Sequence, residues 1–165
     1  MFGLEVFALS EEEEVKTVRD GEITLPYRWV VGPAGVRFFK GLKEKKILGT
    51  RCHKCGRVLV PGRKFCPRDF IELFDWVEVA DEGTIRTYAF VNYSFVGQPR
   101  DPPYIVATID LDGADTGLSH YVMGIDFSDP EKVKDQVKIG MRVKAVWKDK
   151  REGVITDIDY FKPIT

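Results

Sequence analysis

The chain has 165 residues, a length typical of one domain or of two very small ones. Its 25 lysines and arginines against 26 aspartates and glutamates give a formal charge of −1, which argues against a dedicated binder of duplex DNA. Apolar residues make up 44% and aromatic residues 12%, so disorder of the whole chain is excluded. No apolar run approaches the roughly 18 residues that a membrane helix needs.

Charge is spread unevenly along the chain. Residues 1–30 hold seven acidic and three basic residues, a net charge of −4. Residues 41–70 hold nine basic and two acidic residues, a net of +7, and residues 101–135 hold eight acidic and two basic residues, a net of −6. A basic middle between acidic flanks indicates either a local anionic partner or a solvated face. The cysteines lie inside the basic stretch, which favours the functional interpretation.

The first region, residues 1–48, is interpreted as an N-terminal extension followed by a helix. The apolar start contains Glu5, has no basic leader and runs into four glutamates at 11–14, so we expect a cytoplasmic protein and a solvated segment. The pattern becomes helical from about residue 36 to 46, because Phe38, Phe39 and Leu42 fall on one helix face. We place Lys43, Lys45 and Lys46 in its last turn, because the helix dipole favours positive charge at the C-terminal end. Pro26, Gly32, Pro33 and Gly35 interrupt the preceding segment and argue against one continuous helix there.

The second region, residues 49–73, begins with the pattern of a zinc knuckle. Cys52 and Cys55 are two residues apart and are followed by Gly56. This turn points two sulfurs at one place, and the glycine permits its tight backbone. A short strand is expected to lead away over residues 57–61. Three cysteines are too few, and odd in number, for a disulfide framework.

The second turn repeats the spacing of the first with one change. Cys66 is followed by Asp69, where a C-x2-C-x10-C-x2-C ribbon has its fourth cysteine. Structural zinc takes four ligands, and a carboxylate oxygen at about 2.0–2.2 Å can complete the set. His53, whose side chain is expected to point away from the metal, and a water molecule are the other candidates for the fourth ligand. A site that has lost its metal and keeps three cysteines for packing is the alternative.

The third region, residues 74–165, has the pattern of a small barrel. A short helix is expected over residues 130–137, with Ser128 or Asp129 as its cap and Pro130 in its first turn. Short strands with one helical interruption are typical of a Greek-key barrel of the oligonucleotide/oligosaccharide-binding (OB) type. We therefore predict a mainly β fold made of an N-terminal helical segment, a zinc ribbon and an OB-fold barrel. The expected strands lie near residues 74–80, 84–93, 104–111, 117–125, 142–148 and 154–161.

No catalytic constellation stands out in the sequence. A reactive cysteine needs a basic partner and freedom from metal, and all three cysteines are assigned to the knuckles. His120 lies in an expected strand, where it is more often structural than catalytic. Nucleophile-elbow, P-loop and dinucleotide motifs are absent. The loop 94–103 carries Phe95 and is interpreted either as a contact loop or as an ordinary rigid connection.

Together the motifs resemble a known family. The chain is similar to acyl-CoA-associated proteins that join a rubredoxin-like zinc ribbon to an OB-fold barrel, and the resemblance covers roughly residues 36–163. It is carried by Phe-Phe-x-Gly-Leu (38–42), Leu-Gly-Thr-Arg-Cys-x-x-Cys-Gly (48–56), Val-Pro-Gly-Arg-x-Phe-Cys-Pro (60–67), Trp-Val-Glu-Val (76–79), Gly-Thr-Ile (83–85), Pro-Pro-Tyr-Ile-Val-Ala (102–107) and Ile-Gly-Met-Arg-Val (139–143).

The resemblance implies a non-catalytic accessory subunit that assembles with a thiolase-like enzyme and helps to bind acyl-CoA. The partner's pathway would be the degradation of aromatic or steroid acyl-CoA thioesters, or the synthesis of acetoacetyl-CoA and hydroxymethylglutaryl-CoA. The implied cofactors are a structural Zn²⁺ and a CoA thioester shared with the partner. Asp69 departs from the family's fourth cysteine, which bears on metal affinity more than on fold.

Five residues are candidates for contact with acyl-CoA or the partner. Arg63 and Lys64 offer charge to phosphates, and Phe38, Phe39 and Phe95 offer aromatic anchors. The alternative function is a ribbon and barrel that bind single-stranded nucleic acid by base stacking and a basic groove. The acidic stretch 101–135 would repel a phosphate backbone, so a protein partner is favoured. No membrane partner is expected.

Overall fold

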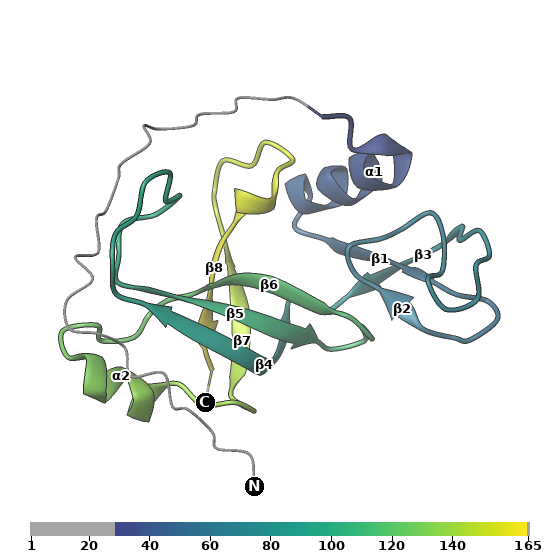
Figure 1. The fold of residues 1–165 in the computed structure, drawn as a ribbon. Coiled ribbons are helices and arrows are strands. Elements are labelled where there is room, and N and C mark those ends of the chain that lie inside the picture. The colour runs from purple at the N-terminus through teal and green to yellow at the C-terminus, as the bar shows by residue number, and fades with distance from the viewer. Residues whose placement is uncertain (1–28, 165) are drawn as a thin grey trace, which may run out of the picture. The chain divides into compact units, whose positions relative to one another are not determined.

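A computed structural model describes residues 29–164 (Figure 1). The glutamates at 11–14, with the rest of the acidic start, lie outside the described residues. Of the helices in the described part, none is long and apolar enough to cross a membrane. In chain order the elements are α1 (Gly32–Lys43), β1 (Ile47–Arg51), β2 (Val58–Leu59), β3 (Asp75–Val79), β4 (Glu82–Val91), β5 (Tyr104–Leu111), β6 (Gly117–Val122), α2 (Pro130–Gln136), β7 (Arg142–Trp147), the 3₁₀ turn η1 (Ile155–Asp157) and β8 (Ile158–Pro163).

Helix α1 begins earlier than the sequence pattern predicts. Pro33 lies in its first turn, where a backbone N–H has no partner within the helix and its loss costs nothing. The helix ends at Lys43, so Lys45, with a φ of 61°, and Lys46 lie beyond it, which corrects the expected last turn. The predicted apolar face is confirmed, because Phe38 and Leu42 are buried.

Strands β2, β1 and β3 form an antiparallel three-stranded sheet in that order. Strand β1 was missed because the expected helix ran to residue 46 and the metal motif follows directly. Strand β3 was expected in the barrel, but it pairs along its whole length with β1, from Ile47 opposite Val79 to Arg51 opposite Asp75. The division into residues 1–48, 49–73 and 74–165 stays a prediction.

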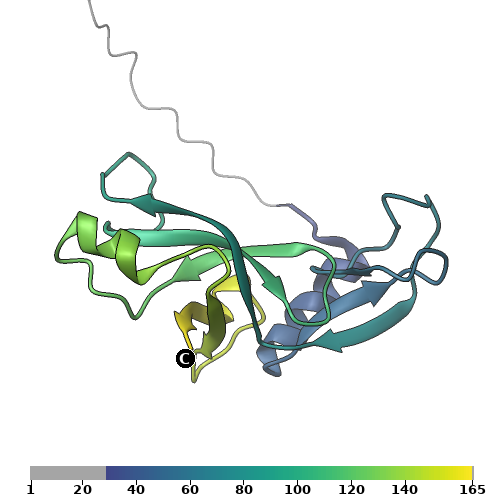
Figure 2. The ribbon, with the colours of Figure 1, turned by 90° about the horizontal axis from the view of Figure 1, so that it is seen from below.

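The remaining strands close into a barrel in the order β4-β5-β6-β8-β7. Alternate residues of β5 are buried, as its sequence pattern predicts, and β4 is bent by an irregularity between Ile85 and Thr87 (Figure 2). Helix α2 interrupts the strands between β6 and β7, and the Asp129 carboxylate caps it by accepting the N–H of Glu131. The last expected strand is corrected, because residues 155–157 form the turn η1 and β8 follows.

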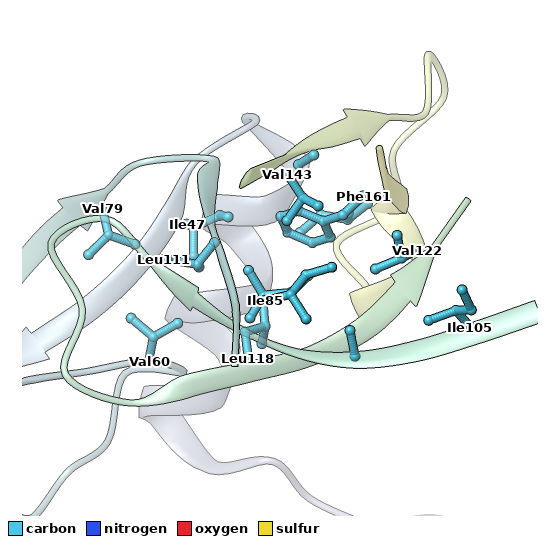
Figure 3. Close-up of a cluster of buried hydrophobic side chains, with 14 of the residues drawn as sticks. Ile47, Val60, Val79, Ile85, Ile105, Leu111, Leu118, Val122, Val143 and Phe161 are labelled. Atoms are coloured by element: carbon cyan, nitrogen blue, oxygen red, sulfur yellow. The ribbon is translucent and has the colours of Figure 1, made fainter. Parts of the chain in front are cut away.

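One hydrophobic cluster joins the helix, the three-stranded sheet and the barrel. Ile47, Val60 and Val79 come from the sheet or the segment beside it, and they pack with barrel residues such as Ile85 and Leu111 (Figure 3). Phe38 and Leu42 of α1 belong to the same cluster. The ribbon is therefore held in place by the same buried surface that fills the barrel.

Candidate metal centre and its surroundings

Two turns of the same construction carry the cysteines. In the first, the Gly56 N–H donates to the Cys52 carbonyl at 2.8 Å, and the Cys52 N–H donates to the Arg57 carbonyl at 2.8 Å. Gly56 has a φ of 75°, a left-handed conformation that glycine adopts without steric cost. The predicted reason for a glycine at this position is therefore confirmed by its backbone angle.

The second turn repeats these bonds. The Phe70 N–H donates to the Cys66 carbonyl at 2.9 Å, and the Cys66 N–H donates to the Ile71 carbonyl at 2.9 Å. Phe70 stands where the first turn has glycine, and its φ is 55°. Equivalent backbone bonds place the side chain of Asp69 where a fourth cysteine would lie in a symmetric pair of knuckles.

The two turns bring four possible ligand atoms together. One atom from each of Cys52, Cys55, Cys66 and Asp69 lies within 4.8 Å of the others. The Asp69 Oδ2 is 3.2 Å from the Cys52 Sγ and 3.4 Å from the Cys66 Sγ, and the Cys55 and Cys66 sulfurs are 3.8 Å apart. None of the three cysteines forms a disulfide. Three sulfurs and one carboxylate oxygen are a donor set that tetrahedral zinc accepts, so these residues fit the metal.

The Asp69 carboxylate accepts hydrogen bonds from the thiols of this cluster. Hydrogen bonds from Cys55 and then Cys52 lower the pKa of Asp69, and the same carboxylate is the main cause that raises the pKa of Cys55 to about 12. A cation bound here takes the place of the thiol protons, because zinc binds thiolate rather than thiol.

His53 lies outside this group. Its ring is exposed and stacks on Phe74, with ring centroids 5.4 Å apart. The expectation that His53 points away from the cysteines agrees with this contact.

A basic pocket of about 340 Å³ lies between α1 and the ribbon. Arg63 and Lys64, both candidates from the sequence, line it together with Arg37 of α1 and Trp76 of β3. The Arg37 guanidinium lies 4.7 Å from the Trp76 ring centroid, a cation–π contact. The sequence does not single out Arg37 and Trp76 as site residues, because only the fold brings α1 and β3 to the same place.

The three phenylalanine candidates differ in their exposure to solvent. Phe38 is 2% exposed and packs in the core, so it has no surface for a ligand or partner, which corrects that expectation. Phe39 is half-buried and lines a groove with Lys40 and Lys43. Phe95 is 51% exposed on the loop between β4 and β5. The structure therefore does not bring the five contact candidates into one site.

Two family models match the chain and together cover the ribbon and most of the barrel. Residues 39–72 match the rubredoxin-like zinc ribbon domain of ChsH2, and residues 76–148 match its C-terminal OB-fold domain. Among solved structures, a DUF35-family protein of unknown function from Sulfolobus solfataricus is similar with a TM-score of 0.58 and 29% identity, over 80% of this chain and 84% of that one. A chain described as "Ltp2-ChsH2(DUF35) aldolase" is similar with a TM-score of 0.58 and 25% identity, over 82% of this chain and 98% of that one.

Curated relatives extend the same comparison. A DUF35 domain-containing scaffold protein from Methanocaldococcus jannaschii is 30% identical over 135 residues, which are 78% of this chain and 90% of the relative. A protein of Thermomonospora curvata, described as "Probable enoyl-CoA hydratase alpha subunit", is 28% identical over 67% of this chain but only 32% of its own length. The ribbon, the barrel and these relatives agree: the chain belongs to the DUF35 family of zinc-ribbon and OB-fold proteins.

Proposed function

We propose that this chain is a non-catalytic accessory subunit of a thiolase-type acyl-CoA enzyme complex. One observation carries the proposal. The chain is similar to a chain described as "Ltp2-ChsH2(DUF35) aldolase", and the similarity covers 98% of the length of that chain. Naming of the relative from M. jannaschii as a scaffold protein supports a role in assembly. The partner's reaction is proposed to be thiolysis of aromatic or steroid acyl-CoA, or synthesis of acetoacetyl-CoA or hydroxymethylglutaryl-CoA.

The cysteine cluster is proposed to hold a structural zinc ion. Cys52, Cys55, Cys66 and Asp69 would supply its four ligands, and zinc would supply a cross-link between the two turns. Cys52 and Cys66 are buried, which suits a closed structural site rather than a catalytic one with an open position.

The basic pocket is proposed to hold the phosphates of CoA. Arg37 reaches it from α1, and Arg63 and Lys64 reach it from the ribbon; among residues 29–164 no acidic side chain lines it. Guanidinium groups bind phosphate oxygens in pairs, and a lysine adds a point charge. The CoA thioester would then be shared between this pocket and the partner's active site.

The described residues favour an accessory role over catalysis. Among residues 29–164, the cysteines all face one another in the metal cluster, and His120 is buried in the barrel with its Nε2 3.3 Å from the Ile155 carbonyl oxygen. Burial is the main cause that lowers the pKa of His120. The ring lines a pocket of about 340 Å³, but among the described residues no acidic, basic or cysteine side chain lines that pocket with it, so His120 has no partner there for acid–base chemistry.

Affinity purification of the full chain from its native host, followed by mass spectrometry, tests the proposal. A thiolase-like polypeptide in stoichiometric amount, retained in moderate salt, is the expected result. Recovery of single-stranded nucleic acid, or of the chain alone, would contradict the accessory role and would favour a free-standing binding module.

A further inference from the structure

The second metal turn holds an aromatic side chain at a position that disfavours it. Phe70 has a φ of 55°, whereas Gly56 occupies the equivalent place in the first turn at 75°. The left-handed region is costly for any residue with a Cβ, and a bulky residue there is a genuine outlier. Because both turns make the same two backbone hydrogen bonds, nothing in the turn itself requires phenylalanine.

Burial does not compensate for this backbone strain. The Phe70 side chain is 85% exposed, so its ring contributes little to the core and presents apolar surface to water. A strained backbone that carries an exposed aromatic ring is typical of a functional position, because the fold gains nothing from either property.

The neighbouring aromatic rings of the ribbon already have contacts within the chain. Lys64 lies over the ring of Phe65 at 5.4 Å, and His53 stacks on Phe74. Among the exposed phenylalanines of residues 65–74, Phe70 is therefore the one for which the described structure gives no ring contact. Single-stranded nucleic acid binds through several free rings along a groove, whereas a protein interface often depends on one aromatic anchor.

Charges around Phe70 indicate the chemistry of the partner surface. Lys54 and Arg68 are exposed on the two turns, while the Asp69 carboxylate faces the thiols and the acidic Glu72 is paired with Lys64 at 3.4 Å. The rim is therefore positive, and an acidic rim around an apolar pocket would complement it.

We infer that Phe70 is the anchor by which the ribbon docks into an apolar, acid-rimmed pocket on the partner enzyme subunit. This inference rests on the proposed function for the existence of that subunit. The ring enters the pocket, and the left-handed backbone of the turn projects it clear of the ribbon. The strained backbone of Phe70 in the free chain then holds the ring in its binding position before the partner arrives, which lowers the entropy lost on binding.

Two substitutions of Phe70 separate anchoring from folding. Phe70→Gly removes the ring and relieves the strain, so we expect the melting temperature of the zinc-loaded full chain to rise by about 2–4 °C. Phe70→Ala removes the ring and keeps the strain, so no such rise is expected. Both should raise the Kd for the purified partner subunit by about 30-fold or more, the range of an interface hot spot.

The experiment is a titration of the partner subunit, purified from the native complex, into wild-type and variant chains of equal zinc content. Phe65→Ala is the matched control, since its ring is already paired with Lys64, and it should change the Kd less than threefold. Unchanged binding by Phe70→Gly would overturn the anchor while leaving the proposed function intact. If the wild-type chain itself binds no partner subunit, the proposed function is contradicted, and the anchor is contradicted with it. Tighter binding of a single-stranded oligonucleotide than of the partner, lost in Phe70→Gly, would overturn the inference in favour of base stacking.

Discussion

Val58 and Asp115 bind each other through two hydrogen bonds that join the ribbon to the barrel. The Val58 N–H donates to the Asp115 carboxylate at 2.7 Å, and the Asp115 N–H donates to the Val58 carbonyl at 2.8 Å. Beside them, the Thr116 hydroxyl accepts the Val60 N–H at 2.7 Å and donates to the Val60 carbonyl at 2.9 Å. The edge strand β2 is thus covered by the β5–β6 loop, which protects it from pairing with another chain.

Replacement of Asp115 tests this junction. Asp115→Ala leaves the N–H of Val58, a buried residue, without its acceptor, so we expect the free energy of unfolding to fall by about 1–3 kcal/mol. Urea denaturation measures the change. Asp135→Ala, at an exposed position of α2, is the matched control and should change stability by less than about 0.5 kcal/mol. Equal stability of the two variants would show that the junction does not depend on this carboxylate.

Asp69 is predicted to be the fourth zinc ligand. Asp69→Ala removes one ligand of a site whose metal binding is coupled to folding, so zinc should be lost to a competing chelator at a lower chelator concentration. Asp69→Cys should restore or strengthen binding, and His53→Ala should leave it unchanged because that ring stacks on Phe74. Zinc content by mass spectrometry reports the result. One tightly held zinc per chain in Asp69→Ala would rule Asp69 out as a ligand.

His120 is predicted to make stability depend on pH near neutrality. Burial is the main cause that lowers its pKa; nearby Arg100 lowers it further, while Asp159 and two backbone contacts act in the opposite direction. Since the unfolded state takes up a proton first, near pH 6.5, stability should be full above about pH 7 and should fall as the pH drops below about 6.5.

The substitution His120→Gln should remove that component of the pH dependence. Urea unfolding of wild type and variant between about pH 5.5 and 7.5 provides the comparison. Parallel curves of stability against pH for the two proteins would mean that His120 has the same pKa in the folded and the unfolded state, which would contradict the prediction.

The basic pocket yields a prediction about CoA. In the assembled complex, Arg37→Ala combined with Arg63→Ala should weaken CoA binding by about 10- to 100-fold, because two charge-assisted contacts to phosphate are removed. Pantetheine, which lacks the phosphates, should bind both proteins equally. Lys138→Ala, an exposed residue outside the pocket, is the control. Calorimetric titration gives the affinities, and equal CoA affinity would place the phosphates elsewhere.

Local sequence patterns were sufficient for most of the architecture. The alternation of β5, the cap at Asp129 and the paired metal turns are properties of a few adjacent residues, so the sequence alone predicts them. Pairing between distant segments was harder to predict. Strand β3 has the pattern of any short strand, and only its partner β1 shows that it pairs in the three-stranded sheet rather than in the barrel.

The surroundings of the site depend on these long-range contacts as well. Arg37 and Trp76 are 39 positions apart in sequence and meet because α1 and β3 both pack on β1 or beside it. Phe38 and Phe39 are adjacent aromatic residues of one helix, and only the packed structure shows that the first is core and the second lines a groove. The backbone angle of Phe70 has no signature in the sequence beyond the missing glycine after Asp69.

The most direct test of the accessory role is reconstitution of the partner's activity. The thiolase-like subunit, purified without this chain, is assayed for acyl-CoA turnover alone and after addition of the chain, and the chain is assayed by itself. We predict no turnover by the chain alone, low turnover by the partner alone and restored turnover when they are combined. Turnover of an acyl-CoA thioester by the isolated chain, or full activity of the partner without it, would contradict the account.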